Sequence, residues 1–247
     1  MGLGIKSFLI RKLRKAGIEI VKYPNGELER RLKIIDHCNI NKLLDVGANE
    51  GQYASLMREL GFNGEIISFE PLSKAYQVLE KESAKDKKWQ SFNCALGDSD
   101  TKSVINIAGN SQSSSILSML PEHIDSAPES KFVDTEEIEI KTLDKIFNEI
   151  AKPGDSLMLK IDTQGYEKMV LDGAAENLHK FAILQLEMST VPLYNNEMLY
   201  MEMINYLAEK GFVLYAFETN FINPQSGKLL QLDGIFVNEK LIQLPKN

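Results

Sequence analysis

The segment at residues 42–51, with the sequence KLLDVGANEG, constrains the fold of this chain more than any other part of it. Its first half is apolar and predicts a buried strand, and Gly47 and Gly51 predict a tight turn before a helix that begins near Gln52. In open α/β sheets, ligands bind where the carboxyl ends of strands meet the amino ends of helices, and glycine lets the backbone approach a ligand closely. The segment therefore predicts a nucleotide-type binding turn.

The spacing of the two glycines differs from the dinucleotide fingerprint Gly-x-Gly-x-x-Gly, which wraps a pyrophosphate at a helix amino terminus. Three residues separate Gly47 from Gly51, and Asn49 stands two positions after Gly47. Asp45 at the strand end and Glu50 within the turn would repel a pyrophosphate, but they suit a cationic ligand without phosphates. S-adenosylmethionine is such a ligand, because it carries a sulfonium and an ammonium group. The sequence also contains no Gly-Lys-Ser/Thr motif, which disfavours a nucleoside triphosphate.

The next predicted strand, at 65–70, ends in a second carboxylate. Glu70 closes an apolar run about twenty residues beyond the glycine turn, and Pro71 stops the strand. A carboxylate at this place can accept hydrogen bonds from both hydroxyls of a ribose. The alternative is an ordinary charged strand end.

Composition limits the class of protein. The chain has 247 residues, 43% of them hydrophobic, which is enough for one well-buried domain core. Its net charge of −7 argues against a general nucleic-acid partner. Cys38 and Cys94 have neither disulfide nor metal-site spacing, so we expect buried thiols in a reducing, cytoplasmic compartment.

The first 40 residues form a predicted N-terminal helical extension, with helices at about 3–16 and 26–38. Residues 1–15 contain five lysines and arginines and no acid, with apolar residues at helical spacing. The apolar part is too short and too interrupted for a secretory signal. We expect this basic helix to pack on its own domain; peripheral membrane contact through residues 1–20 is the alternative.

From residue 41 to residue 247 the pattern predicts one α/β domain, in which strands and helices alternate. The expected strands are 42–47, 65–70, 89–96, 156–162, 181–188, 212–218 and 233–238, and the expected helices are 51–60, 73–84, 165–179 and 196–210. A short polar turn, and no helix, joins the last two strands, so they must be antiparallel. A mostly parallel seven-stranded sheet with one antiparallel strand is the plan of the Rossmann-like class I methyltransferases.

An insertion at 97–141 separates the third and fourth expected strands. Val104, Ile105 and Ile107 resemble a strand, as do Ile138 and Ile140, so a small extra β-element is plausible. The insertion also contains a polar, serine-rich stretch at about 110–115. Long connections tend to be functional lids or disordered segments. The serines therefore have two interpretations, as hydrogen-bond donors to a ligand or as a flexible linker.

Two carboxylates follow the apolar strands that would lie beside the first one. Asp162 ends the strand at 156–162, and Glu187 ends the strand at 181–188. The ends of these strands should meet at the ligand pocket. Each carboxylate could be a general base that removes the proton of a hydroxyl acceptor, or the pair could hold a divalent metal ion. The alternatives are a helix cap or an ion pair.

Two further side chains are harder to place. Lys160 shares a strand face with Asp162, so it could pair with that carboxylate or line the pocket wall. His123 lies in the insertion near the expected substrate entrance, where a surface position is the commoner outcome for a lone histidine.

Several of these motifs together resemble the FkbM family of S-adenosylmethionine-dependent methyltransferases. They are DVGANEG at 45–51, FEP at 69–71, the serines at 113–115, KIDTQGYE at 160–167 and DGIFV at 233–237. The block KIDxxGxE is the most specific of them, and the resemblance runs from about residue 41 to residue 240. It implies a donor site lined by Asp45, Gly47, Ala48, Asn49, Gly51, Glu70 and Pro71, with Asp162 and Glu167 near the transferred methyl group. It carries over no metal requirement.

The resemblance and the residues together predict a cytoplasmic O-methyltransferase that uses S-adenosylmethionine. Its acceptor would be a hydroxyl of a sugar, a glycan or a secondary metabolite, as the resemblance implies. Asp162 and Glu187 are the candidate catalytic residues. The alternatives are a non-catalytic protein that binds an adenosine ligand, and an NAD-dependent oxidoreductase, which the glycine spacing disfavours.

Overall fold

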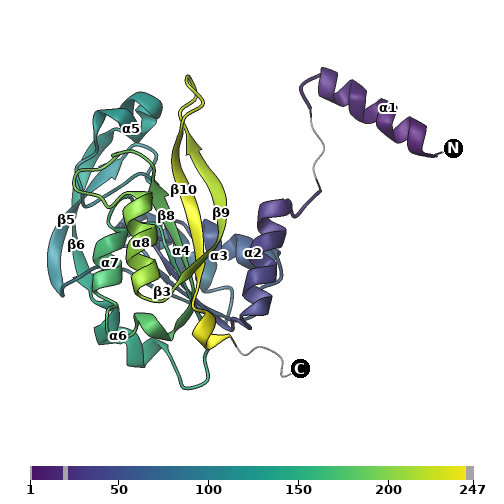
Figure 1. The fold of residues 1–247 in the computed structure, drawn as a ribbon. Helices are drawn as coiled ribbons and strands as arrows, with labels where there is room; N and C mark the ends of the chain where they lie inside the picture. The colour runs from purple at the N-terminus through teal and green to yellow at the C-terminus, as the bar shows by residue number, and fades with distance from the viewer. Residues whose placement is uncertain (1, 19–21, 243–247) are drawn as a thin grey trace. The chain divides into compact units, whose positions relative to one another are not determined.

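The computed structural model describes residues 2–18 and 22–242 (Figure 1). The chain divides into two compact units, Met1–Ile34 and Ile35–Asn247. The predicted helices of the extension are present as α1 (Gly2–Lys15) and α2 (Gly26–His37). Residues 1 and 19–21 lie outside the described residues, so the membrane contact of residues 1–20 stays a prediction, as does a domain boundary at residue 40. No helix within the described ranges is long and apolar enough to cross a bilayer.

The second unit contains the predicted seven-stranded sheet (Figure 1). Its strands are β1 (Lys42–Val46), β2 (Glu65–Phe69), β3 (Trp89–Phe92), β7 (Leu157–Ile161), β8 (Phe181–Ser189), β9 (Val213–Ile222) and β10 (Leu229–Val237). They are ordered β3-β2-β1-β7-β8-β10-β9. Strand β10 pairs antiparallel with both β8 and β9, and the other described strand pairs of this sheet are parallel. The Rossmann-like fold class is therefore confirmed, and the order places β1 beside β7, where the strand order reverses.

Apolar periodicity explains the layers. All five residues of β1 and all nine of β8 are buried, as expected for strands covered on both faces. One large core cluster joins these strands to α6 (Leu143–Ile150), α7 (Glu167–Asp172) and α8 (Tyr200–Glu209). The buried residues of α3 (Gln52–Glu59) and α4 (Ser73–Ser83) lie outside that cluster, as expected for helices on the opposite face.

Some predicted boundaries are wrong. The expected strand at 89–96 is two strands, because β3 ends at Phe92 and β4 (Ala95–Leu96) joins a different sheet. Helix α6 was not predicted. The expected helix at 165–179 ends early, with α7 followed by a 3₁₀ turn at Leu178–Lys180. It ends where Gly173 packs so closely against Gly97 that a Cβ there would lie 1.8 Å from the Gly97 carbonyl oxygen. Strands β9 and β10 are longer than expected, because β9 continues to residue 222 and β10 already begins at residue 229.

The insertion is an ordered subdomain. Strand β5 (Thr101–Ala108) pairs antiparallel with β6 (Phe132–Lys141), and β4 completes a three-stranded sheet. The short helix α5 (Pro121–Ser126) and a 3₁₀ turn at Pro128–Ser130 lie between the two long strands. The expected β-element is thus confirmed. The serine loop is held by hydrogen bonds to the rest of the unit, for example from Ser115 Oγ to the Gln164 carbonyl (2.7 Å), so it is not a free linker.

Candidate active site

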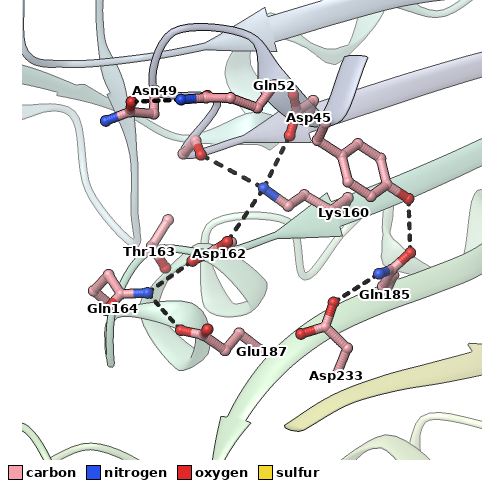
Figure 2. Close-up of polar contacts among 12 residues, drawn as sticks. Asp45, Asn49, Gln52, Lys160, Asp162, Thr163, Gln164, Gln185, Glu187 and Asp233 are labelled. Atoms are coloured by element: carbon pink, nitrogen blue, oxygen red, sulfur yellow. Dashed lines mark hydrogen bonds and ion pairs between the residues drawn. The ribbon is translucent and has the colours of Figure 1, made fainter. Parts of the chain in front are cut away.

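A cavity of about 500 Å³ lies at the carboxyl ends of the central strands, between the sheet and the insertion. It is lined by the first turn, the ends of β2, β7, β8 and β10, part of β9, and the insertion. The polar and backbone-rich part of the lining includes Gly47, Ala48, Asn49, Glu70, Pro71, Ser111, Ser113, Ser114, His123, Glu129, Lys160, Asp162, Gln164, Glu187, Asn220, Gln231 and Asp233. Asp162 and Glu187, predicted from different strands, therefore meet at one cavity (Figure 2).

The first turn has no spare backbone donors. Every backbone N–H from residue 47 to residue 51 already donates a hydrogen bond within the protein. The acceptors are Phe69 O for Gly47 and Ala48, Glu70 Oε2 for Asn49, Gln52 Oε1 for Glu50, and Ala48 O for Gly51. A pyrophosphate-binding turn needs amide groups directed at the ligand. This turn presents carbonyl groups and side chains instead.

Gly47 is required by geometry. Its φ is +76°, and a Cβ at this position would lie 1.9 Å from the carbonyl oxygen of Asp162. The close approach arises because Asp162 N donates to Val46 O (3.0 Å), which continues the β1–β7 pairing beyond the strand ends. Glycine thus brings the first turn against the end of β7, where Asp162 enters the cavity.

Glu70 ties the first turn to the end of β2. One carboxylate oxygen accepts from Asn49 N and the other from Leu72 N, each at 2.8 Å. A carboxylate has about four acceptor positions, so acceptor capacity remains for the hydroxyls of a ribose. The side chain is 4% exposed, and burial raises its pKa to about 7, against the opposing effect of the two N–H groups.

Asp45 and Gly51 are not among the residues that line the cavity. Asp45 is fully buried beneath Lys160, and its Oδ1 forms an ion pair with Lys160 Nζ at 3.1 Å. Gly51 packs against Trp89, where a Cβ would lie 2.9 Å from the indole ring. A donor-binding role for Asp45 and Gly51 stays a prediction, and Asp45 reaches the cavity only through its ion pair with Lys160, which lines it.

Lys160 is the cation of the site. Its Nζ lies 3.1 Å from Asp45 and 3.5 Å from Asp162 Oδ2, and it also lines the cavity, so both interpretations of this lysine hold (Figure 2). Burial lowers its pKa, but Asp45 and Asp162 outweigh that effect and raise it, so the ammonium stays charged. Burial raises the pKa of Asp45, and Lys160 opposes that rise.

Glu187 accepts hydrogen bonds from three side-chain amides. Its Oε1 accepts from Asn220 Nδ2 (2.6 Å), and its Oε2 accepts from Gln164 Nε2 (2.5 Å) and Gln231 Nε2 (2.8 Å). The residue is 6% exposed. Burial, followed by the negative charge of Asp162, raises its pKa well above the ordinary value. Three of its roughly four acceptor positions are filled, which leaves one for a proton from the cavity.

A third carboxylate, Asp233, extends this network. It accepts from Gln185 Nε2 (2.7 Å) and Asn220 Nδ2 (3.2 Å), and Gln185 Oε1 accepts from the Tyr53 hydroxyl (2.7 Å). Burial, then Asp162, raises the pKa of Asp233 to about 6. Asp233, Gln185 and Asn220 had no predicted site role. The available signal was polar residues within otherwise apolar strands, since Asp233 pairs directly with Glu187 across β10 and β8.

His123 is 2% exposed, so the expected surface position is wrong. Its ring lies edge-on to Tyr194, with centroids 5.1 Å apart, and is tilted against Phe221 at 5.4 Å. Burial lowers its pKa to about 4, so the imidazole is neutral near pH 7. Its position follows from the fold of the insertion, which short-range sequence patterns do not encode.

The lining is acidic. It includes Glu70, Glu129, Asp162, Glu187 and Asp233, whereas Lys160 is its single lysine or arginine among the described residues. An acidic cavity with few free amides favours a cationic ligand. Over residues 2–18 and 22–242, no group of three or more His, Cys, Asp or Glu side chains is arranged to hold a metal ion.

Comparison with solved structures finds methyltransferases of low sequence identity. FkbM methyltransferase from Methylobacillus flagellatus KT is 15% identical with a TM-score of 0.49; the match covers 79% of this chain and 44% of that one, so this chain spans less than half of that protein. Burkholderia thailandensis 1,6-didemethyltoxoflavin-N1-methyltransferase, solved with 1,6-didemethyltoxoflavin and S-adenosylhomocysteine, is 9% identical with a TM-score of 0.44, covering 85% of this chain and 76% of that one. No curated protein sequence matches.

The model of the methyltransferase FkbM domain matches residues 45–214, which is more than half of the chain. The matched range begins at Asp45 and includes the first turn, Glu70, the insertion, Asp162 and Glu187. The chain therefore belongs to the FkbM methyltransferase family.

Proposed function

We propose that this protein is an S-adenosylmethionine-dependent O-methyltransferase that acts on a hydroxyl of an uncharged small molecule, a sugar or a secondary metabolite. The observation that carries the donor assignment is the acidic cavity beside a first turn whose backbone N–H groups are all engaged. The family match supports methyl transfer. The buried, unpaired cysteines Cys38 and Cys94 are consistent with a cytoplasmic protein.

The residues of the cavity fit the donor. Glu70 would accept the ribose hydroxyls, and Gly47, Ala48, Asn49 and Pro71 would line the same end. The carboxylates of Asp162 and Glu187 would favour the positively charged methionine end. The bound donor supplies an activated methyl group, so the protein's main tasks are to position the acceptor and to remove its proton.

Glu187 is the better placed general base. It is buried and has one acceptor position left, and burial raises its pKa, which makes it a stronger base than an ordinary carboxylate. Asp162, whose side chain is 34% exposed, lies beside Lys160 and directs negative charge into the cavity. The acidic lining with a single, already paired lysine disfavours acceptors that carry phosphate or carboxylate groups.

The two alternatives differ in what they bind and release. An NAD-dependent oxidoreductase would need amide groups for a pyrophosphate, and residues 47–51 have none to spare. A non-catalytic protein would bind S-adenosylmethionine without turnover. Titration calorimetry with S-adenosylmethionine and NAD, followed by a screen of neutral glycosides for S-adenosylhomocysteine release, tests all three. Preference for NAD would overturn the proposal, and tight donor binding without release for any acceptor would favour the binding protein.

A chelator is expected to leave activity unchanged. The nitrogen Nε2 of Gln164 donates to both Asp162 and Glu187, so a hydrogen-bond donor stands where a shared cation would be coordinated. S-adenosylhomocysteine release would be measured after dialysis against EDTA, with and without added Mg²⁺. Loss of activity on dialysis and recovery with Mg²⁺ would instead assign the pair to a metal.

The affinity for adenosine is expected to rise with pH through the pKa of Glu70. Adenosine carries a ribose but has no group that titrates near neutrality, so it reports on the protein. Glu70 has a pKa of about 7, and its ionised form accepts the ribose hydroxyls better. If only that form binds, affinity at pH 8 exceeds affinity at pH 6 by up to about tenfold.

The matched control is Glu70→Gln, which keeps the shape of the side chain and cannot titrate. Titration calorimetry at pH 6, 7 and 8 should show weaker adenosine binding by the variant, with a flat pH dependence. An equal slope in the two proteins would place the titrating group elsewhere, for example at Asp233, whose pKa is about 6.

A further inference from the structure

The side chain of Gln164 lies between the two candidate catalytic carboxylates (Figure 2). Its Nε2 donates to Asp162 Oδ1 at 2.9 Å and to Glu187 Oε2 at 2.5 Å. An amide nitrogen has two hydrogens, so both are used, one on each carboxylate. Asp162 and Glu187 come from different strands, β7 and β8, and Gln164 bridges them.

Tyr194 and Ser115 hold the rest of Gln164. Its Oε1 accepts from the Tyr194 hydroxyl at 2.8 Å, and its backbone carbonyl accepts from Ser115 Oγ at 2.7 Å. This bond to Oε1 also sets the orientation of the amide, because it leaves the nitrogen facing the carboxylates. The residue is 8% exposed and therefore has little freedom to turn away.

The backbone at this point is also unusual. Gln164 has a φ of 55°, which a residue with a side chain rarely adopts, and Gly165 follows with a φ of 94°. A Cβ on Gly165 would lie 2.9 Å from Cβ of Tyr194. A left-handed conformation is unfavourable for a residue with a side chain. Such conformations persist where the surroundings over-determine them, and here the result is a side chain directed at both carboxylates.

We propose that Gln164 is a positioning residue that holds Asp162 and Glu187 at the separation, and Glu187 in the ionised form, that proton removal from the acceptor requires. This inference rests on the proposed function for its catalytic consequence, but not for its effect on the two carboxylates. Two neighbouring like charges repel, and an N–H donor shared between them reduces that repulsion. Its hydrogen bond also favours the ionised form of Glu187 over the neutral form. The bond from Ser115 also connects the insertion to Gln164, and through Gln164 to the base.

Glu187 is surrounded by other groups that affect its charge. The titratable and charged groups that act on it are Asp162, Asp233, Glu167, Lys160 and Tyr194. All of them stay in place when Gln164 is replaced, so the change isolates the shared donor. A hydrogen bond to a charged group contributes about 1.5–3 kcal/mol, which corresponds to about one to two pH units.

The test is Gln164→Met, which keeps the length of the side chain and removes both donors and the acceptor. The pKa of Glu187 should rise by about one to two pH units. It would be measured by ¹³C NMR of side-chain carboxyls, with Glu187→Gln to assign the signal. In the same variant the ascending limb of the kcat–pH profile should move upward by the same amount, so that kcat below that limb falls about 10- to 100-fold. Gln77→Met, at an exposed position of α4, is the matched control and should change neither.

A second variant keeps the proposal testable if Gln164→Met does not fold. Tyr194→Phe keeps both carboxylates and the donor but removes the hydroxyl that orients the amide, so a smaller upward change in the pKa of Glu187 is expected. An unchanged Glu187 titration in both folded variants would overturn the positioning role. The NMR readout needs no turnover, so a changed titration in a protein without methyl transfer would contradict the proposed function and leave this inference standing.

Discussion

Glu187→Gln is expected to lower kcat by about 10²- to 10⁴-fold, the usual contribution of a general base. The variant keeps the size of the side chain but cannot accept a proton from the acceptor hydroxyl. In the proposed function the methionine end of the donor would face several carboxylates, so donor affinity should fall much less than kcat. Both quantities are measurable, the first by S-adenosylhomocysteine release and the second by titration calorimetry.

The control for this prediction is Glu209→Gln, the same change at an exposed position of α8, which should keep full activity. Asp162→Asn distinguishes the roles of the two carboxylates, because Asp162 forms an ion pair with Lys160 whereas Glu187 accepts hydrogen bonds from three carboxamides. If Asp162→Asn abolishes turnover and Glu187→Gln keeps it, the base is Asp162 and the assignment made above is wrong.

Gly47→Ala is expected to be the most destabilising single change at the first turn, by about 3 kcal/mol or more. The alanine Cβ would lie 1.9 Å from the carbonyl oxygen of Asp162, and that atom belongs to the backbone of a central strand end. Relief of the clash requires β1 and β7 to separate at the cavity. The free energy of unfolding would be measured by urea denaturation, and donor binding should be lost as well.

Gly227→Ala provides a matched control for the backbone conformation. Its φ is +72°, close to the +76° of Gly47, but nothing lies within 4 Å of the added Cβ. Gly227→Ala should therefore lower the free energy of unfolding only by the cost of a left-handed alanine, about 1–2 kcal/mol. If the two alanine variants were equally destabilised, the backbone at Asp162 would be able to move away from the added Cβ at little cost. Gly47 would then be needed only for its left-handed conformation.

The sequence predicted the general chemistry of the first turn, residues 47–51, but not the contacts of the carboxylates around it. The acidic turn correctly predicted a site without phosphate-binding amides, because the glycine spacing and the carboxylates are local properties. The structure adds that Glu70 accepts a hydrogen bond from Asn49 N and that Asp45 forms an ion pair with Lys160. Ion pairs between adjacent strands depend on which strands are neighbours, and that is a property of the sheet order.

The sequence by itself determined the α/β class, the antiparallel last strand, the β-element of the insertion, and the presence of Asp162 and Glu187 at strand ends. These follow from apolar periodicity, turn chemistry and the rule that parallel strands end at one edge. Only the tertiary structure decided that Asp45 lies beneath Lys160, that His123 is buried, and that Gln164 bridges the two carboxylates. The Asp45–Lys160 pair follows from the pairing of β1 with β7, and the Gln164 bridge follows from the neighbouring positions of β7 and β8. The burial of His123 follows from the packing of the insertion, which brings it against Tyr194 and Phe221. Local sequence patterns encode none of these contacts between separate elements.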